Sequence, residues 1–156
     1  MKAESKYISV IGAGRSDAAT GALAEEAGRL VAKSGAVLVC GGMTGVMEAA
    51  CRGASEEGGV TIGILPGLDR SEGNPYLTYS ICTGIGHARN LAVAASGDSV
   101  IAIGGEFGTL SEIGLAAKTG KRVVLLGSWE ISKLGETPHN FVTASTAAEA
   151  VKLALD

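Results

Sequence analysis

Aromatic residues are scarce in this sequence: they make up 4% of its 156 residues, whereas hydrophobic residues of all kinds make up 46%. Alanine, valine, leucine and isoleucine must therefore fill the interior, as they do in parallel sheets that are covered by helices. The length is that of one ordinary domain, and a chain of this size can bury a sizeable core. We therefore expect residues 1–156 to form a single domain.

The sequence also lacks a basic stripe, a long apolar run and a paired set of cysteines. Its net charge is −3 with both signs interspersed, which argues against a nucleic-acid partner. The N-terminal stretch MKAESKYISVIGAG contains an apolar run too short for a signal peptide or a membrane span. The cysteines, Cys40, Cys51 and Cys82, are odd in number and show no CxxC spacing, so neither a disulfide framework nor a zinc site is expected. These absences favour a cytoplasmic protein with no metal site and no membrane partner.

Glycine, in contrast, is abundant, with 24 residues, roughly twice the usual share of about 7%. Most glycines stand at the edges of short apolar runs, and these runs alternate with segments of helical periodicity. The alternation predicts a Rossmann-like α/β fold, a three-layer αβα sandwich with a mainly parallel sheet. The expected strands are 7–11, 36–40, 60–65, 77–82, 99–103, 122–126 and 141–144. The expected helices are 17–34, the segment after Gly45 to about 57, 87–95, the segment after Thr109 to about 118, and a last helix that begins at Thr146.

Three of the expected strand-to-helix turns carry clusters of glycine. The clusters are Gly12 and Gly14; Gly41, Gly42 and Gly45; and Gly104, Gly105 and Gly108. A helix N-terminus has unpaired N–H groups and a partial positive charge, and glycine lets the main chain approach phosphate oxygens closely. Glycines also make tight turns in any fold of this class, but three clusters on one sheet edge favour a phosphate-bearing ligand. Met43 and Thr44, which lie inside the second turn, are included among the expected ligand-binding residues.

Two better-known phosphate-binding motifs are missing. Asp17 stands where the dinucleotide-binding fingerprint needs its third glycine, and a negative side chain there would repel pyrophosphate. No segment matches GxxxxGK[ST] either, which argues against triphosphate hydrolysis assisted by a lysine.

Four segments in this order resemble a known superfamily: GGMTGVMEAACRGA, VTIGILPG, GHARNLAVAASGDSVIAIGG and GGEFGTLSE. Over about positions 7 to 127 the chain is similar to the Lonely Guy phosphoribohydrolases and the related molybdenum cofactor carrier proteins. The resemblance implies a phosphate loop at Gly105, Gly108 and Thr109. It also implies that Arg89 and Glu112 contact the ligand.

Three residues depart from the phosphoribohydrolase pattern, which is PGGxGTxxE with an Arg-Lys pair upstream. Gly104 replaces the proline, Glu106 replaces a glycine and Asn90 replaces the lysine. Glu106 puts a carboxylate in the expected phosphate loop, which weakens anion binding unless its side chain points away. These departures look more like the carrier branch of the superfamily.

The resemblance leaves two functions open. The first is a binding or carrier protein for a phosphorylated heterocycle, such as a nucleotide or the molybdenum cofactor, with no cofactor required for folding. The second is a nucleoside 5′-monophosphate phosphoribohydrolase, in which Glu112 stabilises positive charge on the ribose while Arg89 holds Glu112 ionised or binds a substrate oxygen. Thr109 and Glu112 also have the spacing of a capping box, in which Glu112 would only satisfy main-chain N–H groups.

Two helices predict self-association. The segment ARNLAVAA (88–95) is apolar nearly all round, so it has to cover the sheet and meet something else. In the helix after Thr109, the expected sheet-facing stripe consists of Leu110, Ile113, Gly114 and Ala117, and Glu112 lies off it. We therefore expect a homodimer or homotetramer with Arg89 and Glu112 near the interface.

Overall fold

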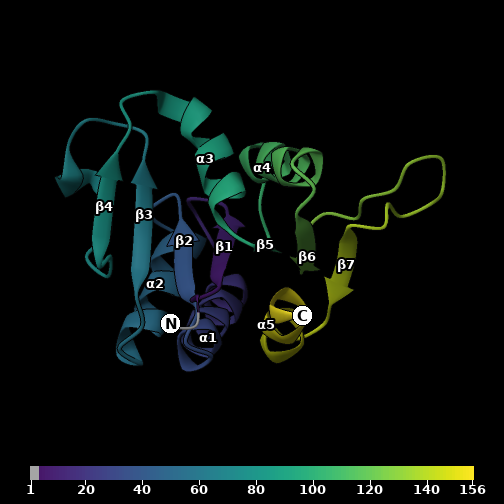
Figure 1. Ribbon diagram of the computed structural model, residues 1–156, viewed down its shortest axis with the longest axis horizontal. Helices are drawn as coiled ribbons and strands as arrows, with labels where there is room; N and C mark the ends of the chain where they lie inside the picture. Colours follow the sequence, from purple (N-terminus) through teal and green to yellow (C-terminus); the bar gives the residue numbers. More distant parts are fainter. Residues whose placement is uncertain (1–3) are drawn as a thin grey trace.

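The computed structural model describes residues 4–156 and shows seven strands flanked by helices on both faces (Figure 1). The strands are β1 (Tyr7–Gly12), β2 (Val37–Cys40), β3 (Thr61–Leu65), β4 (Tyr79–Cys82), β5 (Ser99–Ile103), β6 (Arg122–Leu126) and β7 (Phe141–Ala144). The helices are α1 (Ala18–Lys33), α2 (Val46–Glu56), α3 (Arg89–Ser96), α4 (Phe107–Lys118) and α5 (Ala147–Leu155), with short 3-10 turns η1 (Arg70–Glu72) and η2 (Gly86–Ala88). No helix within residues 4–156 combines the length and the apolarity needed to cross a bilayer.

The strands form one sheet in the order β4-β3-β2-β1-β5-β6-β7, and every neighbouring pair is parallel. The chain runs outward from β1 to β4, then returns to place β5 on the other side of β1. The connections after β1 and β5 therefore leave the sheet in opposite directions. In open α/β sheets such a reversal creates a crevice at the carboxyl ends of the two strands, which is where ligands bind.

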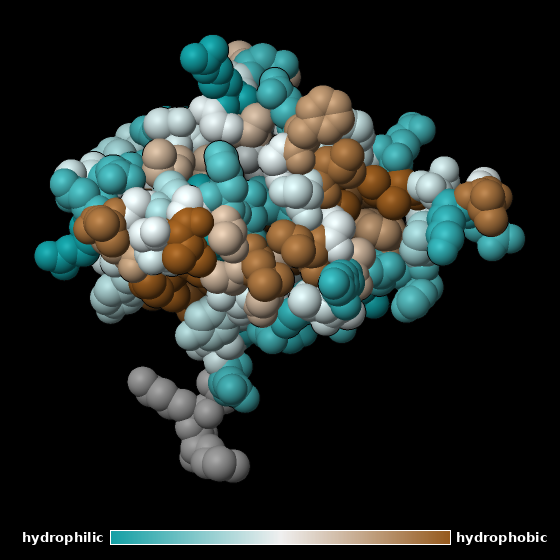
Figure 2. All heavy atoms as spheres, turned by 90° about the horizontal axis from the view of Figure 1, so that it is seen from above, coloured by the Kyte–Doolittle hydropathy of each residue, from teal (hydrophilic) through white to brown (hydrophobic). Residues whose placement is uncertain are grey.

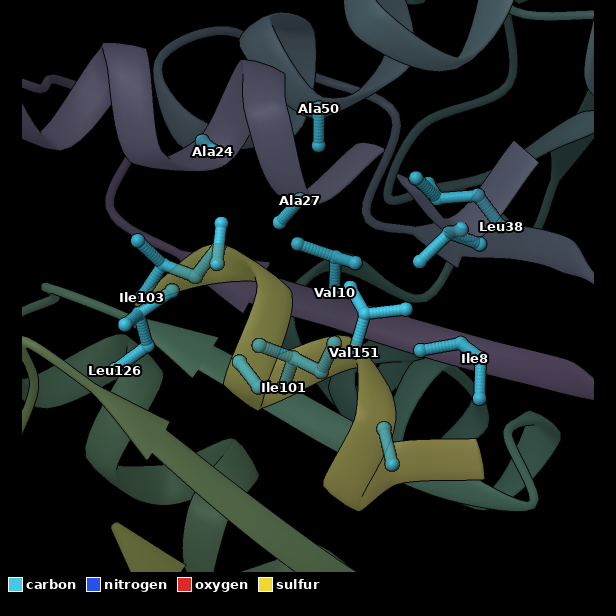
Figure 3. Close-up of a cluster of buried hydrophobic side chains, with 14 of the residues drawn as sticks. Ile8, Val10, Ala24, Ala27, Leu38, Ala50, Ile101, Ile103, Leu126 and Val151 are labelled. Carbon is cyan, nitrogen blue, oxygen red and sulfur yellow. The ribbon is translucent and has the colours of Figure 1, made fainter. Parts of the chain in front are cut away.

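The helices cover the two sheet faces unequally. Helices α1, α2 and α5 cover one face, where Figure 3 shows alanines of α1 and α2 and Val151 of α5 directed at Val10 and Ile101. Helices α3 and α4 cover the other face and bury Val93 and Ile113 against it. Side chains alternate along a strand, so consecutive residues of β5 point to opposite faces of the sheet. All five are buried, because helices cover both faces. The expected three-layer sandwich is confirmed.

Helices α1 and α2 approach each other closely through glycine. A Cβ atom at Gly28 would lie 2.7 Å from the carbonyl carbon of Ala50, and one at Gly53 would lie 2.8 Å from that of Glu25. Main chain therefore meets main chain at this crossing, and neither position has room for a side chain. These two glycines serve packing between helices and have no part in a ligand site.

Most expected elements are confirmed, and their ends agree with the local capping chemistry. Asp17 caps α1 by accepting a hydrogen bond from Thr20 N at 2.7 Å, and Thr146 caps α5 by accepting one from Glu149 N at 3.1 Å. The expected helix 87–95 begins later, because a 3-10 turn precedes α3.

The expected buried stripe of α4 is confirmed at Ile113 and wrong at Gly114, and Glu112, which was expected off the stripe, is buried. The buried residues of α4 are Thr109, Glu112, Ile113 and Ala116, whereas Gly114 is exposed. Apolar residues surround this helix, so the sequence contained no clear periodicity to orient it. The two polar residues face inward because the sheet leaves a cavity beneath the first turns of α4.

Candidate functional site

A cavity of about 240 Å³ lies at the crevice between the carboxyl ends of β1 and β5. Its walls come from the turn after β1, from α2, from the η2–α3 segment and from the first turns of α4. The lining residues are Gly12, Ala13, Gly14, Met47, His87, Arg89, Asn90, Glu106, Gly108, Thr109 and Glu112. The structure therefore brings together seven of the expected site residues: Gly12, Gly14, Arg89, Asn90, Gly108, Thr109 and Glu112.

The N-terminus of α4 forms one wall of this cavity. Its N-cap residue, Glu106, is exposed, and its side chain makes no capping hydrogen bond. The N–H groups of the first turn are therefore not occupied by a side-chain cap and carry the partial positive charge of the helix end. Gly105 has a φ of +102°, and a Cβ there would lie 2.5 Å from the Cβ of Thr109, so only glycine fits this turn. The helix end suits an anion, and the carboxylate of Glu106, which lines the same cavity, opposes one.

Arg89 supplies a positive charge to the same cavity from inside the protein. Its side chain is buried, with 8% exposed, and its guanidinium donates to the side-chain oxygen of Asn90. Within residues 4–156 its Nε atom has no hydrogen-bond partner. Gly41 makes room for the guanidinium, because a Cβ at that position would lie 2.9 Å from Arg89 Nη2. A buried cation with an unused donor at a cavity wall favours a bound anion.

Glu112 also lines the cavity and is buried, with 7% exposed. Burial raises the pKa of its carboxyl to about 7, and the charge of Arg89 offsets this effect only in part. The two side chains form no ion pair in the part of the chain that the structure describes. Arg89 therefore lowers the pKa of Glu112, but loss of hydration at this buried carboxyl outweighs the attraction. That Arg89 holds Glu112 ionised or binds a substrate oxygen stays a prediction.

The capping-box interpretation of Thr109 and Glu112 is also wrong. Helix α4 begins at Phe107 and its N-cap is Glu106, so Thr109 already lies inside the first turn. Glu112 therefore has no free main-chain N–H of the helix end within its reach as a cap. Its burial beside the cavity has to serve another purpose.

Comparison with known proteins places this fold and cavity in a family. A family model described as the SLOG cluster4 family matches residues 5–154. The chain belongs to the SLOG cluster4 family. An uncharacterized protein of Archaeoglobus fulgidus is 45% identical over 119 residues, which are 76% of this chain and 78% of that protein.

Two solved structures extend the comparison. The molybdenum cofactor binding protein of Rippkaea orientalis is 34% identical, with a TM-score of 0.87 over 96% of this chain and 95% of that one. The molybdenum cofactor carrier protein of Chlamydomonas reinhardtii is 31% identical, with a TM-score of 0.80 over 97% of both chains. The resemblance to carrier proteins that the sequence segments indicated is confirmed.

In this SLOG cluster4 protein the second glycine cluster supports the cavity without lining it. Gly45 has a φ of +66° and precedes α2, where a Cβ would lie 2.5 Å from the carbonyl carbon of Gly14. Thr44 Oγ1 donates to the Gly14 carbonyl at 2.8 Å, so this cluster fixes the turn after β1. Gly42 donates from its main-chain N to Cys40 Sγ at 3.3 Å.

The remaining expected site residues lie elsewhere. The carbonyl of Met43 accepts from Asn74 Nδ2 at 3.0 Å, and its side chain packs against the core. Gly104 and Gly105 line a separate cavity on the other side of the 104–109 turn. Both cavities therefore share this turn as a wall.

Four residues that line the first cavity were not among the expected ligand-binding residues: Ala13, Met47, His87 and Glu106. Met47 contributes to the cavity wall from α2, and His87 contributes from η2. The position of His87 two residues before Arg89 offered a signal, because both residues lie where the chain enters α3. No feature of the sequence distinguishes Met47 from the other apolar residues of α2.

Proposed function

We propose that this protein binds and carries a phosphate-bearing heterocyclic small molecule, whose phosphate group sits between Arg89 and the first turn of α4. One observation carries the proposal: Arg89, a buried cationic residue whose Nε has no partner within residues 4–156, and an uncapped helix N-terminus line the same cavity. Both groups attract an anion, and together they fix its position from two directions.

The similar structures support the choice of cargo. Both are described as proteins that bind or carry the molybdenum cofactor, which is a phosphate-bearing pterin. Ligand pockets for small molecules usually have about 300–1,000 Å³. At about 240 Å³ the cavity accommodates a phosphate and its neighbouring atoms, and the ring of the cargo would extend out of it. Nucleoside monophosphates are the simplest probes of the same chemistry.

Binding of such probes tests the proposal directly. Calorimetric titration with inorganic phosphate, ribose 5-phosphate and AMP should give saturable binding that Arg89→Met weakens at least tenfold. Arg70→Met removes the same charge from an exposed position outside the cavity and serves as the matched control. Arg89→Lys keeps the charge but lacks the Nε donor, and circular dichroism of each variant verifies its fold. Equal binding by the two methionine variants would contradict the proposal.

A phosphoribohydrolase remains the second candidate, because Glu112 and Arg89 line the cavity beside Thr109. Stabilising positive charge on the ribose needs an ionised carboxylate. With its pKa near 7, Glu112 is protonated in a large fraction of molecules at neutral pH, which favours binding over hydrolysis. Incubation with AMP and chromatographic detection of free adenine separates the two functions. Adenine release that rises above pH 7 and disappears in Glu112→Ala would establish the enzyme.

We also propose that two copies associate through the α3 side of the sheet. The outer strands β3 and β4 are left partly uncovered there, and exposed apolar side chains include Tyr79, Ile81 and Leu91, with 61%, 50% and 47% exposed. An apolar cavity of about 310 Å³, lined by Tyr7, Val39, Ile62, Ile64, Ile81 and Ser96, lies beside them. Figure 2 shows apolar side chains gathered in several groups on the face seen from above. Exposed apolar patches of this kind mark interfaces.

Light scattering at micromolar concentration tests this association. The wild type should have twice the mass of the chain or more, and Leu91→Glu should shift it toward the monomer, because a charge at the interface loses its hydration. Ser111→Glu on the exposed face of α4 is the control and should leave the mass unchanged. A wild type with the mass of one chain would remove the proposal.

A further inference from the structure

Two of the few aromatic residues of this chain meet beside the 104–109 turn. Phe107 is the first residue of α4, and Trp129 follows β6, so the adjacent positions of α4 and β6 bring them together (Figure 1). Their ring centroids are 5.7 Å apart with an angle of 45° between the planes. The sequence contains one tryptophan and two phenylalanines, so this pair includes the tryptophan and one of the two phenylalanines.

The protein neither buries the ring of Phe107 nor, within the described residues, provides an acceptor for the indole N–H of Trp129. Phe107 is 79% exposed although it is fully apolar. The indole Nε1 of Trp129 has no hydrogen-bond partner within residues 4–156, and the atom is shielded from solvent. Buried tryptophan N–H groups normally find an acceptor. An exposed apolar ring therefore lies next to an indole whose N–H has no acceptor among the described residues.

Trp129 lines a cavity of about 410 Å³, and Phe107 packs against Trp129 without lining it. The other lining residues are Gly104, Gly105, Gly127, Ser128 and Glu130. The three glycines give it walls without side chains. Ser128 Oγ donates to the Gly104 carbonyl at 2.5 Å, which ties the segment after β6 to the 104–109 turn. Glu130 is exposed at the rim and offers a carboxylate as an acceptor for amino groups.

We infer that this second cavity is a subsite for the heteroaromatic ring of the cargo, a purine or pterin that carries amino and carbonyl groups. The inference rests on the proposed function, because it needs the phosphate of the same molecule on the other side of the 104–109 turn. That turn contributes Gly108 and Thr109 to the first cavity and Gly104 and Gly105 to the second. The ring stacks on Trp129, as bases do on aromatic side chains, and Phe107 supports Trp129 through the contact between their rings.

Fluorescence of Trp129 tests the subsite without any substitution, because it is the only tryptophan of the chain. AMP should quench or shift its emission in a saturable manner. Ribose 5-phosphate has the phosphate but no ring, so it should compete with AMP while leaving the emission unchanged. Phe107→Leu removes the ring that supports Trp129, so it should weaken AMP binding roughly tenfold and leave ribose 5-phosphate binding unchanged. Leu134→Ala is the control, since it removes an exposed apolar side chain that lines neither cavity.

The outcomes separate the subsite from the proposed function. If ribose 5-phosphate and AMP bind equally well and the emission of Trp129 stays constant, the subsite is wrong while the phosphate site stands. If Phe107→Leu lowers the mass of the assembly and weakens both ligands alike, a second copy covers Phe107 and the subsite is again wrong. If no phosphate compound binds at all, the proposed function fails together with the inference.

Discussion

Glu112 offers the most quantitative test of the site's electrostatics. The carboxyl is buried beside the cavity, and burial raises its pKa from an ordinary value of 4.5 to about 7. In the unfolded chain the same carboxyl is hydrated and ionises at the ordinary value. The folded protein therefore prefers the protonated acid, and its stability falls as the pH rises from about 4.5 to about 7.

The size of this effect follows from the shift. Each pH unit between the two pKa values corresponds to about 1.4 kcal/mol. The free energy of unfolding above pH 7 is therefore about 3 kcal/mol lower than it is below pH 4.5. Glutamine has the shape of the protonated acid and carries no charge. Glu112→Gln should therefore match the wild type at about pH 4 and be more stable by about 3 kcal/mol at about pH 8.

Urea unfolding, followed by circular dichroism at several pH values and one protein concentration, measures the difference between the two proteins. Glu106→Gln removes an exposed carboxylate from the same turn and controls for a general effect of one negative charge. A difference between Glu112→Gln and wild type that does not change with pH would refute the reasoning. A difference of opposite sign would mean that Arg89 outweighs the loss of hydration after all.

Further predictions concern packing and thiol access. Gly28→Ala and Gly53→Ala should each destabilise the protein by about 1–3 kcal/mol, because their methyl groups would meet the main chain of the facing helix. Gly114→Ala adds a methyl group where no atom lies within 4 Å and should stabilise α4 by about 0.5–1 kcal/mol. Thermal melting should therefore show a lower melting temperature for the first two variants and a higher one for Gly114→Ala. Cys40 and Cys51 are fully buried with their sulfur atoms 3.4 Å apart, whereas Cys82 is partly exposed. A thiol reagent should therefore label at most Cys82 in the native protein and all cysteines in denaturant; rapid native labelling of Cys40 or Cys51 would contradict this burial.

The fold could be predicted from local signals that survive in the tertiary structure. Apolar runs bounded by glycine or proline fixed the strands, and β5, β6 and β7 have the expected bounds because the ends of these runs coincide with the ends of pairing. The caps Asp17 and Thr146 marked helix starts by side-chain chemistry that acts over three residues. Such signals need no knowledge of distant contacts.

Which residues line the site could be predicted only in part from the sequence, because the lining depends on contacts between distant segments. Gly108 was expected in the site and lines the cavity, whereas Gly41, expected to contact the ligand, instead makes room for Arg89. The orientation of α4 also depended on a cavity formed by β1 and β5, which no property of the helix itself contains. The shifted pKa of Glu112 has the same origin, since burial is a property of the assembled fold.

Nuclear magnetic resonance of the isotope-labelled protein, titrated with AMP, tests the anion site most directly. The account predicts that the amide signals of Phe107–Thr109 and the Nε–H signal of Arg89 move together and saturate at one affinity, since both groups bind the same phosphate. Saturation in which these signals stay fixed while other amides move would contradict it.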